Sequence, residues 1–227
     1  MPDLRSPWWQ AFVAVCGIHL VLLAADATPW DSITKCLAAP LLVGWVLAER
    51  GPRILAVALT FCLGGDLFLE IESLFVFGMV SFALAHVCFT AWFVSRGALD
   101  GLRARPAVPA ALVLAAVVLV AVVWGGVDDA VVRYALPFYA LLLVGTAATA
   151  LATDRVAGIG GLLFLVSDAV IALGVADRID DTAVWAKLTI MVLYFAAIAL
   201  LTAGATSLPH RAVDSRPNPA AGGISTV

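Results

Sequence analysis

The residues of this sequence with the clearest capacity for chemistry are ionisable side chains that lie inside long apolar stretches. They are His19, Lys35, Asp66, His86, Asp168 and Lys187. A charge buried in a membrane-spanning segment is energetically costly, and it usually faces a protein-lined cavity rather than lipid. Each of these residues is therefore a candidate for a functional site.

Two of them, Asp66 and Asp168, are carboxylic acids, and a buried pair of carboxyl groups suits acid–base catalysis. In a low-dielectric site two like charges disfavour each other, so one group can hold a proton while the other stays ionised. Hydrolases that form oxocarbenium-like ions use such a pair, with one group as the acid and the other to stabilise the cation or to activate water. We therefore predict that Asp66 and Asp168 are catalytic.

Other catalytic chemistries have weaker support in the sequence. A catalytic zinc site needs about three His or carboxylate ligands, and only two histidines are embedded. A Ser-His-Asp arrangement could draw on Ser81, Ser167 and His86, but no GxSxG-like turn accompanies them. The four cysteines never form a close pair and fit packing positions. We expect neither a metal nor a cofactor.

The apolar stretches that carry these residues are predicted to be transmembrane helices. Of the 227 residues, 63% are hydrophobic and 13% are charged, whereas roughly 25% of the residues of a soluble domain are charged. Because a spanning helix needs about 20 residues, we expect an all-α bundle of about eight transmembrane helices over residues 1–204. These helices are expected at residues 8–25, 31–49, 53–70, 74–95, 107–125, 131–152, 156–175 and 183–203. Residues 205–227 are polar and rich in Pro and Gly, which predicts a disordered cytoplasmic tail.

The basic residues predict how the bundle is oriented. Nine arginines lie on one side of an eight-span arrangement, and two, Arg133 and Arg178, lie on the other side, where acidic residues gather. Lys and Arg near helix ends stay on the cytoplasmic side of a membrane. We therefore expect both termini in the cytoplasm and a multi-pass protein of the plasma (inner) membrane.

The two aspartates are expected at a similar depth. The spans at 53–70 and 156–175 run outward and place Asp66 and Asp168 in their outer halves, while the spans with Lys35 and Lys187 run inward from the same side. Both aspartates follow Gly-containing segments, GGDLFLE and GGLLFLVSDAVIAL, whose small residues permit close helix packing. Because the two spans are also four apart, this similarity suggests an internal repeat of four helices.

The charged candidates also have structural interpretations. Asp66 and Asp168 could form structural ion pairs with the two lysines, although buried pairs are expensive to retain without a use. Lys35 and Lys187 lie close enough to their helix ends to reach the membrane interface. If these lysines instead face the site, they could hold a lipid phosphate.

The histidines and the last tyrosine leave similar alternatives open. His86, in the middle of its span, could be a hydrogen-bonded core histidine or a member of the site, and His19 fits a structural role. Tyr194 has the pattern of a packing or interfacial aromatic residue. The candidate substrate-binding residues are Lys35, His86, Lys187 and Tyr194.

Four segments resemble the YhhN/TMEM86 lysoplasmalogenases, a family of multi-span membrane proteins of similar length. The segments are TKCLAAPLL (34–42), GGDLFLE (64–70), FVFGMVSFALAHVCF (75–89) and GGLLFLVSDAVIAL (160–173). They occur in the family's order, and they cover most of the second, third, fourth and seventh predicted spans.

The resemblance implies hydrolysis of the vinyl ether bond of a lysoplasmalogen, which gives a fatty aldehyde and a glycerophospho-base. By motif, Asp66 and Asp168 match the family's GD and SD aspartates. Lys35 matches the lysine of its TKP-like segment, and His86 matches its helix 4 histidine. The chain departs from the family pattern at Phe89, where a tyrosine is common.

Two other classes of function remain open from the sequence. One is a small transporter or channel, in which buried Asp and Lys relay protons or ions. The other is a lipid-binding membrane protein, which would tolerate the loss of either aspartate. Expected partners are a lysophospholipid substrate and membrane lipids. The net charge of −3 and the lack of a basic stretch argue against nucleic acid, and the sequence predicts no particular oligomeric state.

Overall fold

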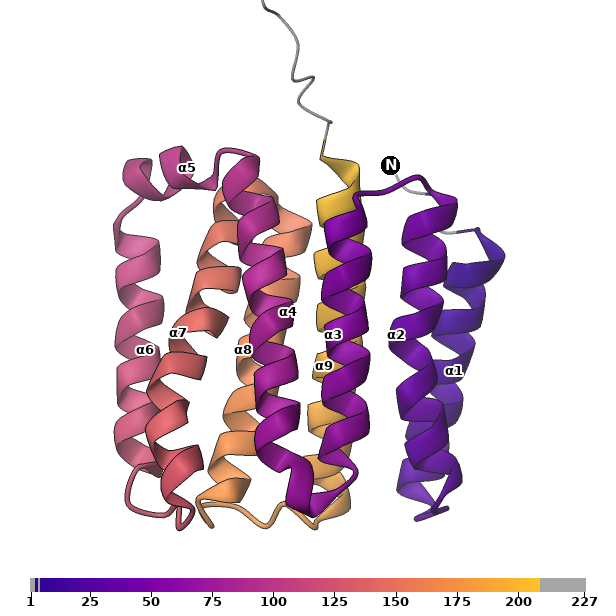
Figure 1. The fold of residues 1–227 in the computed structure, drawn as a ribbon, viewed down its shortest axis with the longest axis vertical. Helices are drawn as coiled ribbons and strands as arrows, with labels where there is room; N and C mark the ends of the chain where they lie inside the picture. Colours follow the sequence, from indigo (N-terminus) through magenta and orange to yellow (C-terminus); the bar gives the residue numbers. More distant parts are fainter. Residues whose placement is uncertain (1–2, 4, 209–227) are drawn as a thin grey trace, which may run out of the picture.

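The described part of the protein contains helices and no strand. A computed structural model describes residue 3 and residues 5–208 (Figure 1). The helices are α1 (Pro7–Ala24), α2 (Trp30–Ala48), α3 (Arg53–Leu69), the 3-10 turn η1 (Glu72–Leu74), α4 (Phe75–Ser95), α5 (Ala98–Ala104), α6 (Ala107–Val123), α7 (Ala130–Thr153), α8 (Arg155–Val175) and α9 (Val184–Ser207). The all-α fold class is confirmed. From residue 209 onward, the predicted disordered tail lies outside the described residues.

Most of the long helices qualify as membrane spans. Within the described residues, α1, α2, α4, α7, α8 and α9 are long and apolar enough to cross a membrane. α3 and α6 have 17 residues each, at the short end of the roughly 17–25 residues that a span requires, and both run alongside the other six (Figure 1). The protein is thus a polytopic membrane protein, and the count of eight spans stays a prediction.

α5 was not among the expected helices. It begins after Gly97, whose φ of 94° ends α4, and Pro106 separates it from α6. Its 7 residues are too few to span a membrane, and its bend against α6 is 91°. On its exposed surface Arg103 and Asp100 form an ion pair of 3.1 Å. α5 therefore lies across the end of the bundle (Figure 1).

The long helices form a ring with one helix outside it. α1, α2, α3, α4, α7, α8 and α9 pack in this order, and α9 returns to α1, while α6 packs outside the ring against α7. In the first half of the chain, α1 packs against α2, α2 against α3, and α3 against α4. The second half repeats this packing order with α6, α7, α8 and α9. Such recurrence is what a four-helix repeat would produce, and the repeat itself stays a prediction.

The outer surface of the bundle is apolar, as a lipid-facing surface must be. α6 exposes Leu114, Val117 and Val118, and it buries only Val123 among its described residues. A soluble monomer rarely exposes a contiguous apolar face of this kind. The exposed face of α6 thus has the apolar composition of a lipid-facing helix.

α8 and α9 approach each other closely because of two glycines. A Cβ atom on Gly160 would lie 2.5 Å from the backbone nitrogen of Leu201, and one on Gly204 would lie 2.4 Å from that of Ala157. Small residues of this kind let the backbones of membrane helices pack directly. The positions of Asp168 on α8 and of the residues on α9 are therefore fixed relative to each other.

The candidate residues gather toward one end of the bundle. The start of α1 and the end of α9 lie together at the opposite end (Figure 1). Asp66 and Asp168 occur late in α3 and α8, which run away from the termini, while Lys35 and Lys187 occur early in α2 and α9, which run back. All four residues thus lie in the half of the bundle that is distant from the termini.

Candidate active site

A cavity of about 290 Å³ lies inside the bundle in this half. Its walls come from α3, α4, α6, α7, α8 and α9, with one residue from α2. Most of the lining is aliphatic or aromatic, and the polar lining residues are Lys35, Asp66, Tyr139, Ser167, Asp168 and Tyr194. The two aspartates, which we expected to share a cavity, both line this one.

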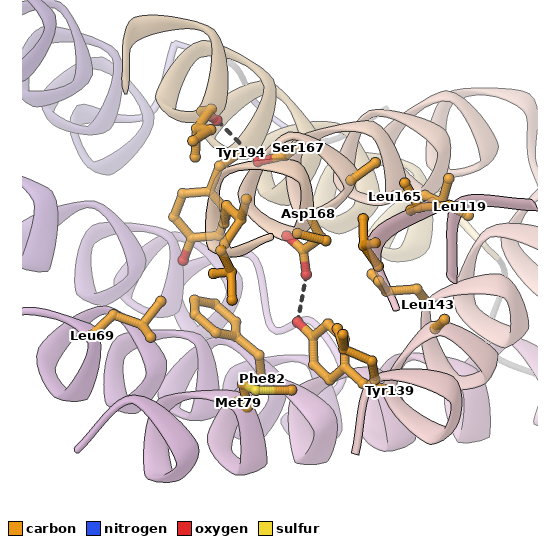
Figure 2. Close-up of a pocket in the computed structure, with 18 of the residues that line it drawn as sticks. Leu69, Met79, Phe82, Leu119, Tyr139, Leu143, Leu165, Ser167, Asp168 and Tyr194 are labelled. Atoms are coloured by element: carbon orange, nitrogen blue, oxygen red, sulfur yellow. Dashed lines mark hydrogen bonds between the residues drawn. The ribbon is translucent and has the colours of Figure 1, made fainter. Parts of the chain in front are cut away.

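Asp168 is held by a tyrosine from the neighbouring helix. The Tyr139 hydroxyl on α7 donates a hydrogen bond of 2.5 Å to Oδ2 of Asp168, and Figure 2 shows the two groups pointing at each other across the cavity. Tyr139 was not among the predicted site residues. The available signal was a tyrosine in the middle of an apolar span, because a buried hydroxyl usually requires a partner.

Asp66 is held in the same way by a different helix. The Tyr194 hydroxyl on α9 donates a hydrogen bond of 2.7 Å to Oδ2 of Asp66, whose side chain is 2% exposed. Tyr194, which was expected to bind substrate, lines the cavity, and its hydroxyl binds a carboxyl group there. Each aspartate therefore has one oxygen fixed by a tyrosine.

Aromatic rings fix the Tyr194 side chain against α4 and α8. Its ring meets Phe82 edge-on with centroids 5.8 Å apart and Phe164 edge-on at 5.5 Å. Edge-to-face contacts at such distances are favourable beyond the burial of the rings. Phe82 and Tyr194 also line the cavity (Figure 2), so this cluster forms part of its wall.

His86 lies behind the cavity and is not one of its lining residues. It is fully buried, and its Nδ1 lies 3.1 Å from the Thr146 hydroxyl. Its ring packs edge-on against Phe164 at 4.5 Å and against Tyr139 at 5.9 Å. His86 thus contacts residues that surround the aspartates and does not itself line the cavity.

Lys35 lies at the edge of the cavity in an ion pair that the sequence did not predict. Its ammonium group lies 2.7 Å from Glu70, which follows the end of α3, and the Ser32 hydroxyl donates to the same carboxylate at 2.5 Å. Burial raises the pKa of Glu70, but the charge of Lys35 and these two hydrogen bonds lower it more, so the pKa lies below the ordinary value. Glu70 is therefore ionised at neutral pH and forms an ion pair with Lys35.

The two aspartates differ in the charges around them. The Lys35 ammonium interacts electrostatically with Asp66 as well as with Glu70. Among the described residues, no cation has a comparable effect on Asp168, whose neighbours are the Tyr139 hydroxyl and the Asp66 carboxyl group. The site is therefore asymmetric: of the two aspartates, Asp66 alone lies near a cation, and the Glu70 carboxylate opposes the effect of that cation less strongly.

Lys187 lines a second, smaller pocket of about 180 Å³ rather than the cavity. His19, which was expected to be structural, lines this pocket too. In the part of the chain that the structure describes, no three His, Cys, Asp or Glu side chains converge as metal ligands. The ionisable side chains that line the cavity itself are Lys35, the two aspartates and their tyrosines.

Comparisons with known proteins place this sequence in a family. A sequence model described as the YhhN family matches residues 30–205. The chain belongs to the YhhN family. It is 30% identical over 220 residues to a Homo sapiens protein named Lysoplasmalogenase TMEM86B, with 94% of this chain and 92% of the relative covered. It is 29% identical over 216 residues to the Rattus norvegicus protein of the same name, with 92% and 87% covered. No solved structure matches the chain.

The YhhN-family match contains the whole ionisable lining of the cavity. Lys35, both aspartates and both of their tyrosines lie within residues 30–205, whereas His19 on α1 precedes this range. The tyrosine–aspartate pairs thus belong to the YhhN-family part of the chain. The second pocket combines residues from this part with a residue from outside it.

Proposed function

We propose that this protein hydrolyses the vinyl ether bond of lysoplasmalogens, releasing a fatty aldehyde and a glycerophospho-base. Two relatives named lysoplasmalogenase, similar over most of both chains, support this substrate class. The observation that carries the proposal is that Asp66 and Asp168, each hydrogen-bonded by a tyrosine, line one largely apolar cavity inside the membrane bundle.

The lining of the cavity suits a single-chain lipid. Apart from its polar residues, the cavity is bounded by aliphatic side chains of α6, α7 and α8, such as Leu119, Leu143 and Leu165 (Figure 2). Pockets of this kind bind apolar ligands through burial and orient them through a few polar groups. The alkenyl chain would pack against the aliphatic wall, and the vinyl ether would lie beside the carboxyl groups.

We assign the general acid to Asp168 and the charge-stabilising carboxylate to Asp66. A carboxylate is stabilised by a nearby cation, and Lys35 acts on Asp66 more strongly than the Glu70 carboxylate opposes it. Asp168 has a tyrosine and a like-charged neighbour instead. Two carboxyl groups with different surroundings divide the acid and the anionic roles in this way.

The reaction follows from this division. Asp168 gives its proton to the β-carbon of the vinyl ether, and the C=C electron pair forms the new C–H bond, which leaves an oxocarbenium ion. The Asp66 carboxylate stabilises this cation. Water adds to the charged carbon and loses a proton, which restores the acid, and the resulting hemiacetal collapses to the aldehyde and the free glycerol hydroxyl. One water is consumed, and no oxidant or reductant is required.

The direct test uses the purified protein with a lysoplasmalogen and with its saturated ether analogue. The proposal expects fatty aldehyde from the vinyl ether lipid and none from the saturated ether, because only the double bond can accept the proton. If neither lipid releases aldehyde and the reconstituted protein instead carries an ion or proton flux, the transporter alternative is correct.

We also propose that both termini face the cytoplasm and that the protein lies in the plasma (inner) membrane. The support is the placement of nine of the eleven loop arginines at the level of the termini in an eight-span arrangement. In this orientation the cavity lies in the outer half of the bundle.

A further inference from the structure

The second pocket adjoins the cavity and has the opposite character. Its polar lining consists of His19, Asp31, Ser32, Lys35, Glu70 and Lys187. Lys35, Ile190 and Met191 line both spaces. A ligand with an apolar chain and a polar head could therefore place its chain in the cavity and its head in this pocket.

His19 lines the pocket and has one unpaired ring nitrogen. The side chain is 2% exposed, and its Nδ1 lies 2.9 Å from the backbone carbonyl of Asp31. A carbonyl oxygen can only accept, so Nδ1 carries a proton and donates it. Nε2 is buried and has no hydrogen-bond partner in the described structure. In the neutral ring this atom is an acceptor, and burying it unpaired is unfavourable unless a ligand supplies a donor.

Two further groups of the pocket lack a close partner. Lys187 lies beyond ion-pair distance of the described carboxylates, with the exposed Asp180 acting on it from farther away, whereas Lys35 is already paired with Glu70 at 2.7 Å. Oδ1 of Asp31 is buried without a hydrogen-bond partner. The residues that line the pocket thus carry one cation without a close partner and two unpaired acceptors, and this combination fits a ligand that has both an anion and hydrogen-bond donors.

We propose that this pocket binds the polar head of the lysophospholipid, with Lys187 against the phosphate and His19 Nε2 accepting a hydrogen bond from the free glycerol hydroxyl. The inference rests on the proposed function, because it takes the chain and the vinyl ether to lie in the adjoining cavity. Asp31 Oδ1 accepts a hydrogen bond from a further donor group of the lipid's polar head. A lyso-lipid has this free hydroxyl, and a lipid with two chains lacks it. His19 therefore determines the specificity for lyso-lipids over two-chain lipids.

Three variants separate these contacts from structural effects. Lys187→Met removes the charge and keeps the length of the side chain. His19→Asn removes Nε2, while its amide nitrogen can take the place of Nδ1 and keep the hydrogen bond to Asp31. Arg103→Met is the matched control, because it removes a charge from the exposed surface of α5 at the other end of the bundle. Thermal unfolding in detergent checks that each variant folds.

Binding is measured with saturated ether lipids, which the protein cannot hydrolyse, by titration calorimetry of the full chain in detergent. The probes are 1-alkyl-glycero-3-phosphoethanolamine, the same lipid with its glycerol hydroxyl methylated, 1-alkyl-glycerol, and glycerol 3-phosphate without a chain. We expect the phosphate to tighten binding to the parent about tenfold or more, the effect of one charge-assisted hydrogen bond. Lys187→Met should remove this preference. Methylation should weaken binding to the parent several-fold and leave binding to His19→Asn unchanged.

The inference is overturned if Lys187→Met keeps the phosphate preference, if methylation affects parent and His19→Asn alike, or if Arg103→Met matches Lys187→Met. It is also overturned if glycerol 3-phosphate binds as tightly as the phospholipid, since the pocket would then be a site for free phosphates. Aldehyde release from the vinyl ether lipid is assayed separately. A parent that binds the lipid as expected but releases no aldehyde refutes the proposed hydrolysis and supports the head-binding pocket.

Discussion

The Tyr194 hydroxyl donates a hydrogen bond of 2.7 Å to Oδ2 of Asp66, and this bond joins α9 to α3 across 128 positions of the chain. Tyr139 holds Asp168 in the same way from α7, at 2.5 Å. A donor on one carboxyl oxygen fixes the orientation of the group and leaves the other oxygen to act on a substrate. The paired arrangement is the basis of the predictions that follow.

We expect Asp66→Asn and Asp168→Asn each to abolish aldehyde release while the protein stays folded. An amide keeps the volume and a hydrogen bond to the tyrosine, but it can neither deliver a proton nor stabilise a cation. The loss of a general acid lowers the rate by about 10²–10⁴-fold. Turnover of a lysoplasmalogen in detergent measures the effect, with Asp100→Asn on the exposed surface of α5 as the control.

The two-carboxylate mechanism is wrong if either of these Asn variants keeps most of the parent's turnover. Loss of turnover in Asp100→Asn to the same degree would contradict it as well, because that change lies far from the cavity.

We expect Tyr139→Phe and Tyr194→Phe to lower kcat by about 10- to 100-fold with little change in KM. Each change removes one hydrogen bond to a carboxyl group, an interaction of roughly 1.5–3 kcal/mol. Tyr134→Phe is the matched control, since Tyr134 also lies on α7 but is 65% exposed on the outside of the bundle. An unchanged kcat in both site variants would show that the tyrosines do not position the acids.

The positions of the long helices could be predicted from sequence because each span is a long apolar run bounded by charges or by Pro and Gly. The predicted span at 156–175, for example, starts one residue after the observed start of α8 and ends with it. α5 was missed because seven residues with an arginine and an aspartate resemble a loop, and only the turn at Gly97 reveals a separate helix.

The shared cavity of the aspartates was predictable from the cost of placing charges in lipid. The partners Tyr139 of Asp168 and Glu70 of Lys35 were not predictable, because these contacts depend on how the helices are rotated against each other, which the sequence does not specify. His86 shows the same limit, since half a turn of α4 decides whether a histidine lines the cavity or lies behind it. Lys187 likewise faces the second pocket, although its depth matches that of the cavity.

We expect Glu70→Gln to lower thermal stability at neutral pH by about 2–4 °C, the shift that ~1 kcal/mol produces in a chain of this size. The pKa of Glu70 is raised by burial and lowered more strongly by Lys35 and by hydrogen bonds, so it lies below the ordinary 4.5. A group with a lowered pKa stabilises the fold above its ordinary pKa, and this contribution disappears as the pH falls through the folded value. Melting curves of parent and variant should therefore differ above pH 4.5 and converge in more acidic buffer. A difference that grows in acid would contradict the ion pair.

We expect a reporter fused to the C-terminus to be active in the cytoplasm. The arginines near the ends of α2, α3 and α4 lie at the level of the termini, and basic residues are retained on the cytoplasmic side. Paired fusions of a cytoplasmic and an exported reporter measure the orientation. Activity of the exported reporter alone would move the cavity to the inner half of the membrane.

The central claim is that an aspartate protonates the vinyl carbon, and hydrolysis in deuterated water tests it most directly. Asp168 exchanges its proton with the solvent, so each turnover should place one deuterium on the carbon next to the aldehyde, and trapping with a hydrazine followed by mass spectrometry detects it. Unlabelled aldehyde incubated under the same conditions corrects for later exchange. We predict one deuterium per aldehyde from the parent and no enzymatic aldehyde from Asp168→Asn. Aldehyde without enzymatic deuterium, or labelled aldehyde from Asp168→Asn at the rate of the parent, would contradict the account.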